Sequence, residues 1–162
     1  MLPSTERRRM FRRALLVFVA VLVTGALAVG GAEGTSAGKF RVVIEESGSV
    51  SSLQGRFGLF APSGADSGTS ALQVQISPVR YRGGQRYEIH SGVDTMHGKK
   101  GGLKLTFSGP SVNAGPSLYI EYGTWRISSA SGIYKGWKGG GNWGGTDNEQ
   151  TYHLQWEGLV TR

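Results

Sequence analysis

Residues 151–157 read TYHLQWE, and this stretch decides the fold class. Its apolar side chains, Tyr152, Leu154 and Trp156, alternate with polar ones, which is the period of a β-strand with one buried and one wet face. Tyr152 and Trp156 are therefore predicted core residues. The same alternation recurs in three other segments, residues 40–44, 72–76 and 103–107.

Turn signals rich in glycine, proline and serine separate these segments, and no stretch after residue 38 keeps a helical period over three turns. The spacing predicts about eight strands, near residues 39–46, 54–61, 67–77, 79–90, 102–108, 117–128, 132–139 and 151–161. The last strand runs almost to the C-terminus, and glycines occur inside strands where barrel walls bend. The predicted fold is a small all-β antiparallel barrel preceded by an N-terminal signal helix.

The first 38 residues differ in kind from the rest. Five arginines precede an uncharged apolar run at residues 14–29, which ends in Ala26-Leu27-Ala28. This is the order of a cleavable secretory leader. We expect a signal peptide at residues 1–28, a flexible linker at 29–38 and the barrel at 39–162. Arg8-Arg9 also resembles a twin-arginine signal, so export by the general or the twin-arginine route, and a retained anchor, are the alternatives.

Removing the leader changes the charge argument. Residues 1–28 hold five of the 18 Lys+Arg and one of the 11 Asp+Glu, which leaves 13 basic and 10 acidic side chains and a net charge of +3. The high pI therefore belongs largely to the leader, and binding to nucleic acid is not expected. The chain has no cysteine, so the exported domain must be stable without disulfides.

A glycine-rich segment carries a family resemblance. Residues 131–141, SGIYKGWKGGG, are similar to the T-G-x-Y-x-x-x-x-G-x-G stretch of dirigent and allene oxide cyclase-like β-barrel proteins, with Gly132, Tyr134, Gly139 and Gly141 at the matching positions. Residues 66–69, DSGT, look like the opening of an earlier strand in secreted bacterial members. The resemblance implies a barrel. The plant members cyclise an allene oxide or steer radical coupling, but their active-site residues do not align here, so no catalytic residue is assigned.

The glycine run at residues 139–145 has two interpretations. It is either a mobile hairpin tip or a loop at a barrel mouth, where Trp137 and Trp143 cover an apolar or planar ligand. The predicted ligand-binding residues are Trp125, Tyr134, Trp137 and Trp143.

Several potential metal ligands fall close together in the sequence. Glu88, His90, Asp94 and His97 lie within ten residues. Because Tyr87 and Ile89 are the apolar partners in that strand, we expect Glu88 and His90 to face water, as does His153 in its own strand. No metal site and no cofactor are predicted.

The sequence thus predicts a secreted barrel that binds a small apolar or aromatic molecule and has no identified catalytic residue. Any catalysis would be of an isomerase or cyclase type. The alternatives are a carbohydrate-binding or cell-surface module that uses exposed tryptophans on polysaccharide, and a structural barrel with a filled interior. Contact with a membrane is expected only through the N-terminal segment before cleavage, and homo-oligomerisation stays open.

Overall fold

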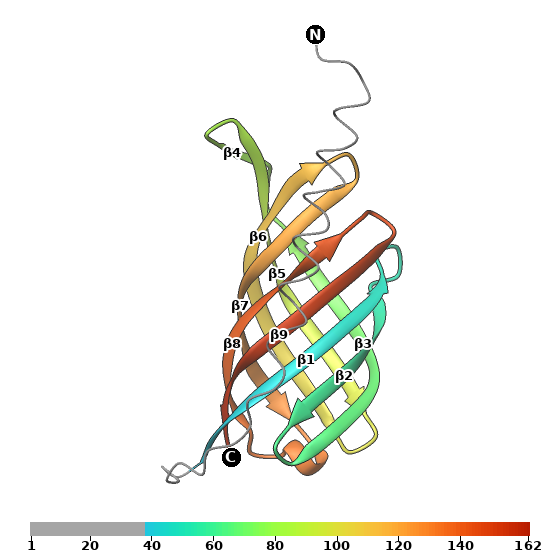
Figure 1. Cartoon of the computed structure of the whole chain (residues 1–162), viewed down its shortest axis with the longest axis vertical. Coiled ribbons are helices and arrows are strands. Elements are labelled where there is room, and N and C mark those ends of the chain that lie inside the picture. Colours follow the sequence, from blue (N-terminus) through green and yellow to red (C-terminus); the bar gives the residue numbers. More distant parts are fainter. Residues whose placement is uncertain (1–37) are drawn as a thin grey trace, which may run out of the picture. The chain divides into compact units, whose positions relative to one another are not determined.

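The computed structural model describes residues 38–162, which form nine β-strands and one short 3-10 turn, with no α-helix among them (Figure 1). The strands are β1 (Lys39–Ser49), β2 (Gln54–Ala61), β3 (Gly64–Ile76), β4 (Arg80–Arg82), β5 (Gln85–Gly98), β6 (Gly102–Gly115), β7 (Leu118–Ala130), β8 (Lys138–Asp147) and β9 (Thr151–Thr161). The 3-10 turn η1 spans Gly132–Tyr134. The predicted signal segment and the linker up to residue 37 lie outside the described residues.

The sheet closes on itself. Strand β1 pairs with β9 along its whole length, from Lys39 opposite Thr161 to Ser49 opposite Thr151, and β3 pairs with β5. Eight strands therefore form a closed antiparallel barrel, which confirms the predicted fold class, and β4 is a short strand added beside β5. All the pairings between the described strands lie between residues 39 and 161, and these residues belong to one compact unit.

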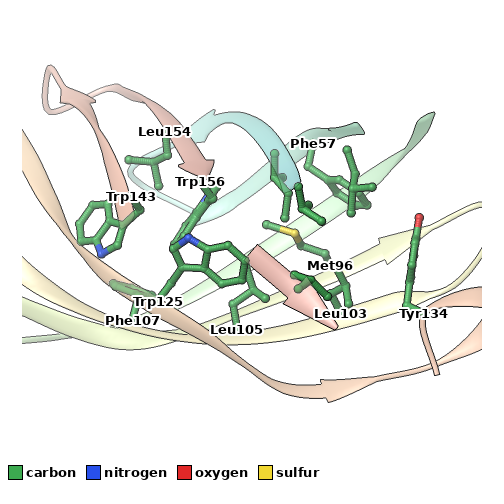
Figure 2. Packing of buried hydrophobic residues seen from close by; sticks show 14 of the residues in the cluster. Phe57, Met96, Leu103, Leu105, Phe107, Trp125, Tyr134, Trp143, Leu154 and Trp156 are labelled. Atoms are coloured by element: carbon green, nitrogen blue, oxygen red, sulfur yellow. The ribbon is translucent and has the colours of Figure 1, made fainter. Parts of the chain in front are cut away.

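Inward-facing side chains of the eight barrel strands fill the interior, and Figure 2 shows part of this cluster. Trp156 has no exposed surface, which confirms its predicted place in the core. Its ring stacks on Trp143 with centroids 5.5 Å apart and meets Phe107 edge-on at 5.6 Å. Burying a large apolar side chain contributes about 1.5–3 kcal/mol, so this cluster supplies much of the barrel's stability.

The two ends of the barrel are built from different segments (Figure 1). The end that we call the β4 end carries the hairpin of β4 and the turns at residues 50–53, 116–117 and 148–150. The opposite end, the Tyr134 end, carries the turns at residues 62–63 and 99–101 and the segment 131–137, which contains η1.

The predicted strand at residues 132–139 is wrong, and so are both interpretations of the glycine run. Residues 132–134 form the 3-10 turn, and the glycines lie in β8, a full strand of the barrel wall. At Gly141 the next strand comes so close that a Cβ would collide with the carbonyl oxygen of Glu157. Gly139 has a φ of +147°, which other residues rarely adopt. Here glycine allows close strand packing instead of interrupting it.

Two further boundaries differ from the prediction. The predicted strand at 79–90 is split by a tight turn at Gly83 and Gly84, which have φ values of +57° and +80°. These left-handed conformations suit a two-residue hairpin between β4 and β5. Gly109 and Pro110, residue types that the sequence analysis treats as turn signals, lie inside β6 opposite His90 and Ile89.

Candidate functional site inside the barrel

The four predicted ligand-binding residues are all buried in the core. Trp125 donates from Nε1 to the carbonyl oxygens of Asn142 at 2.9 Å and Glu157 at 3.2 Å, and Trp143 packs on Trp156. Tyr134 and Trp137 pack on each other at the Tyr134 end, so the structure does not unite the four in one pocket. All four tryptophans of the chain are at most 5% exposed, so none offers a surface platform for polysaccharide.

Tyr134 has a structural partner in Asp66. Its hydroxyl donates to Asp66 Oδ2 at 2.6 Å, and the backbone N–H groups of Ser67, Lys99 and Lys100 donate to the same carboxylate at 2.8–3.1 Å. Burial disfavours the Asp66 charge, but these donors outweigh it and lower the pKa of Asp66. Burial and the Asp66 carboxylate raise the pKa of Tyr134. The two segments that carry the resemblance thus meet here, and their contact ties the start of β3 to the segment that follows β7.

A second carboxylate lies deep in the interior. Glu46 of β1 is 4% exposed and accepts three hydrogen bonds, from Ser70 Oγ at 2.6 Å, Tyr152 OH at 3.1 Å and Trp156 Nε1 at 3.1 Å. Burial raises the pKa of Glu46, and the donated hydrogen bonds oppose that rise. Three converging donors are the environment that an ionised carboxylate requires in a protein interior.

Asp94 of β5 forms an acid pair with Glu46. Its side chain is fully buried, and no donor among the described residues reaches either carboxyl oxygen in hydrogen-bonding geometry. Burial raises the pKa of Asp94 to about 9, and the charge of the neighbouring Glu46 adds to the rise. At neutral pH Asp94 therefore holds a proton, beside the carboxylate of Glu46. Such a pair can give a proton to, or accept one from, a molecule that reaches it.

A third polar group lies on the inner face nearer the β4 end. His90 Nδ1 is 2.8 Å from Glu121 Oε1, and His90 Nε2 is 3.7 Å from Glu88 Oε2. The imidazole reaches across β6 to Glu121 because Gly109, directly opposite it, has no side chain. Burial alone would lower the pKa of His90, but the hydrogen bond and charge of Glu121 and the charge of Glu88 outweigh it and raise the pKa. Glu121 is 7% exposed, so this is a largely buried ion pair.

Asp147 of β8 adds a carboxyl group to the same end. Its pKa is raised by burial and by the charge of Glu121, while the backbone N–H of Glu149 and the charge of His90 oppose the rise. The β4 end therefore holds three carboxyl groups, those of Glu88, Glu121 and Asp147, and two cationic partners, His90 and the half-exposed Arg86.

The expected outward orientation of Glu88 and His90 is wrong. They share the inner face of β5 with Asp94 and Met96, both fully buried, whereas Tyr87 and Ile89 line a groove on the outer wall. Polar and apolar residues do alternate here, but the polar ones face the interior and the apolar ones face outward. The physical reason is that β5 is continuous for 14 residues, so the buried Met96 fixes the inner face for the whole strand.

The two other histidines turn away from this group. His153 is exposed, as predicted, and His97 lines a groove on the outer wall with Arg56 and Thr69. Among residues 38–162, no three histidine or acidic side chains come together in a way that could hold a metal ion.

Sequence reasoning missed Glu46, Ser70 and Glu121 altogether. Glu46 and Ser70 could have been found from the sequence, because each lies two positions from an apolar residue that faces the interior of the barrel. Glu46 follows Ile44 by two positions, and Ser70 precedes Leu72 by two. Polar residues that continue the inner face of a strand are the pattern to look for.

Comparison with known proteins gave no relative: no family model matches the chain, and neither a curated protein nor a solved structure is significantly similar to it. Within residues 38–162 there is no helix of the length and apolar character needed to span a membrane.

Proposed function

We propose that this chain is a small-molecule-binding barrel whose ligand has an apolar or aromatic body and a cationic, hydrogen-bond-donating group. The observation that carries the proposal is the inward orientation of Glu88, Glu121 and Asp147. Inward carboxylates oppose folding unless they are paired, and His90 and the half-exposed Arg86 supply only two positive charges for these three groups. A protonated amine would supply the missing positive charge and the missing donors.

The apolar part of this ligand would meet aromatic and aliphatic side chains on the same inner face. Phe107 and Trp143 pack edge-on at 5.4 Å, and Leu72 and Leu154 are buried on other strands of the barrel. The faces of aromatic rings attract organic cations by about 0.5–2 kcal/mol. The acid pair of Glu46 and Asp94 lies deeper in the same interior and would serve as a proton donor or acceptor if the ligand reaches it.

Membership of the dirigent and allene oxide cyclase-like barrels, secretion and removal of the leader belong to the same proposal. The support for membership is the closed eight-strand barrel and the contact between Tyr134 and Asp66, one residue from each segment that carries the resemblance. The support for secretion is the order of charged, apolar and small residues before residue 29.

The proposal is tested by tryptophan fluorescence of residues 38–162, which contain all four tryptophans and every strand. The probes are 2-phenylethylamine, its neutral isostere 2-phenylethanol and its anionic isostere phenylacetate. We expect the amine to perturb the emission at lower concentration than either isostere. Glu121→Gln should weaken amine binding about tenfold, since one charged partner is lost.

Glu157→Gln is the matched control. Glu157 lies on the outer wall in an exposed pair with Arg41 at 2.8 Å, so its loss should leave amine binding unchanged. Equal responses to the three probes, or equal weakening by the two substitutions, would reject the cationic ligand. No response to any probe would favour a structural barrel with a filled interior. The burial of Trp125, Trp143 and Trp156 in one core cluster is consistent with that alternative.

A further inference from the structure

The outer wall near the β4 end is apolar where a barrel should be polar. Because Glu88, His90 and Glu121 turn inward, their neighbours in the strands turn outward. Ile120 is 47% exposed and Tyr122 is 52% exposed. The outward apolar residues of adjacent strands form one patch, which we call the outer apolar face: Tyr87, Ile89, Pro110, Val112, Ile120 and Tyr122.

This face is hollowed into a groove of about 440 Å³. Its walls are the six residues of the outer apolar face, and Arg82 and Gln85 complete its lining. Contiguous apolar patches on the surface of a soluble domain are usually sites of contact with another molecule. The groove therefore combines an apolar floor with a cationic and hydrogen-bonding edge.

The charge at that edge is positive. Arg80 lies opposite Tyr87 and Arg82 lies opposite Gln85, so both arginines share the outer face with the groove. Neither makes an ion pair with another residue of the described part of the chain, whereas Arg86, on the other face of the hairpin, pairs with Glu88 at 2.9 Å. No carboxylate lines the groove.

We propose that the outer apolar face and its two arginines dock on an anionic lipid surface. Arginine side chains next to a bilayer attract acidic headgroups, and tyrosine and isoleucine side chains are suited to the boundary between headgroups and acyl chains. The groove accepts apolar parts of a lipid while Arg80 and Arg82 contact its phosphate. This interaction is separate from ligand binding in the interior and does not depend on it.

Co-sedimentation of residues 38–162 with lipid vesicles tests the proposal without interference from the apolar leader. We expect binding to phosphatidylcholine vesicles that contain phosphatidylglycerol and much weaker binding to phosphatidylcholine alone. The double variant Arg80→Glu/Arg82→Glu should weaken binding at least about tenfold, since two attractive contacts with the acidic surface become repulsive. Ile120→Ser/Tyr122→Ser should weaken it by the loss of apolar contact.

The matched control is Lys104→Glu/Arg126→Glu. These exposed residues lie on β6 and β7 nearer the Tyr134 end, and the double substitution changes the net charge by the same amount. Its binding should fall clearly less than that of the Arg80→Glu/Arg82→Glu variant. Equal loss in the two charge variants, or no binding by the unmodified domain, would overturn the proposal. So would a dimer in light scattering that Ile120→Ser/Tyr122→Ser abolishes, because the face would then belong to a second copy.

Discussion

The two ends of this barrel solve the problem of inward polar groups in opposite ways. At the Tyr134 end, Asp66 faces inward and receives four hydrogen bonds from the chain itself. At the β4 end, Glu88, Glu121 and Asp147 have only two cationic partners, His90 and the half-exposed Arg86. The four donors at the Tyr134 end stabilise the ionised carboxylate of Asp66 and hold the surrounding segments in place. The β4 end has more carboxyl groups than cationic partners, and under the proposed function the amine of the ligand supplies the remaining positive charge.

We expect the largest effect from a substitution at the Tyr134 end, which should lower the free energy of unfolding more than one at the β4 end. Tyr134→Ala removes a buried aromatic ring and strips Asp66 of a donor, so we expect a loss of about 3–5 kcal/mol in the free energy of unfolding. His90→Ala at the β4 end should cost less, because the side chain lost is smaller and Glu88 keeps Arg86 as a partner. Urea denaturation of both variants measures the difference. Similar losses would mean that the β4 end is equally structural.

The acid pair between the two ends gives the next effect. The pKa of Asp94 is raised to about 9, so between about pH 4 and pH 9 the folded state binds more protons than the unfolded state. Stability should therefore fall as the pH rises through this window, by at most about 1.4 kcal/mol per pH unit. Asp94→Asn keeps the size of the side chain, cannot ionise and should remove this dependence.

Thermal unfolding at pH 5 and pH 8 measures this prediction. The Asp94→Asn variant should gain stability relative to the unmodified protein at pH 8, by about 1 kcal/mol or more, and little at pH 5. Ser67→Ala, a small change outside the acid pair, is the control and should follow the unmodified protein at both pH values. Parallel pH profiles for all three proteins would show that Asp94 is ionised when folded.

His90 gives a smaller effect. The pKa of His90 is raised by Glu121 and Glu88, so its contribution to stability is complete below about pH 6.5 and is lost as the pH rises through the folded pKa. His90→Gln should therefore cost less than about 1 kcal/mol at pH 6, after allowance for solvent screening, and still less at pH 9. A proton NMR titration of the imidazole checks the direction of the shift. A pKa below the ordinary value would contradict it.

The smallest effect is expected on the outer wall. Arg41 pairs with Glu157 at 2.8 Å, but both side chains are about half exposed or more. Arg41→Ala should change the free energy of unfolding by no more than about 0.5 kcal/mol. Chemical denaturation provides the measurement, and a larger loss would show that exposed pairs brace the wall where β1 meets β9.

Much of the fold could be predicted because apolar residues alternate through most strands. Tyr152, Leu154 and Trp156 alone indicate β9 and its buried face. Strand β8 could not be found in this way, because a run of glycines carries no alternation. Its geometry depends on how closely the neighbouring strands approach Gly141. Local sequence does not contain that information.

The inward polar groups at the β4 end could not be predicted from the alternation of residues either. Near the β4 end of β5 the inner face is polar and the outer face is apolar, so the usual rule assigns Tyr87 and Ile89 to the wrong side. Only the unbroken register from Met96 back to Glu88 reveals the exchange. The aromatic residues predicted to bind a ligand, such as Trp125 and Trp143, belong to the core. The inward positions of Glu46, Glu88 and Glu121 became apparent only from the structure.

The pairing of the first strand with the last also governs how this barrel folds. Lys39 lies opposite Thr161, so β1 gains one of its two neighbours only after nearly all of the domain has been made. Contacts between such distant parts of a chain are slow to form, and barrels of this kind fold in milliseconds to seconds. Until then β1 and β9 each expose an unpaired edge. The interval before closure is therefore when aggregation, or capture by a chaperone, competes most strongly with folding.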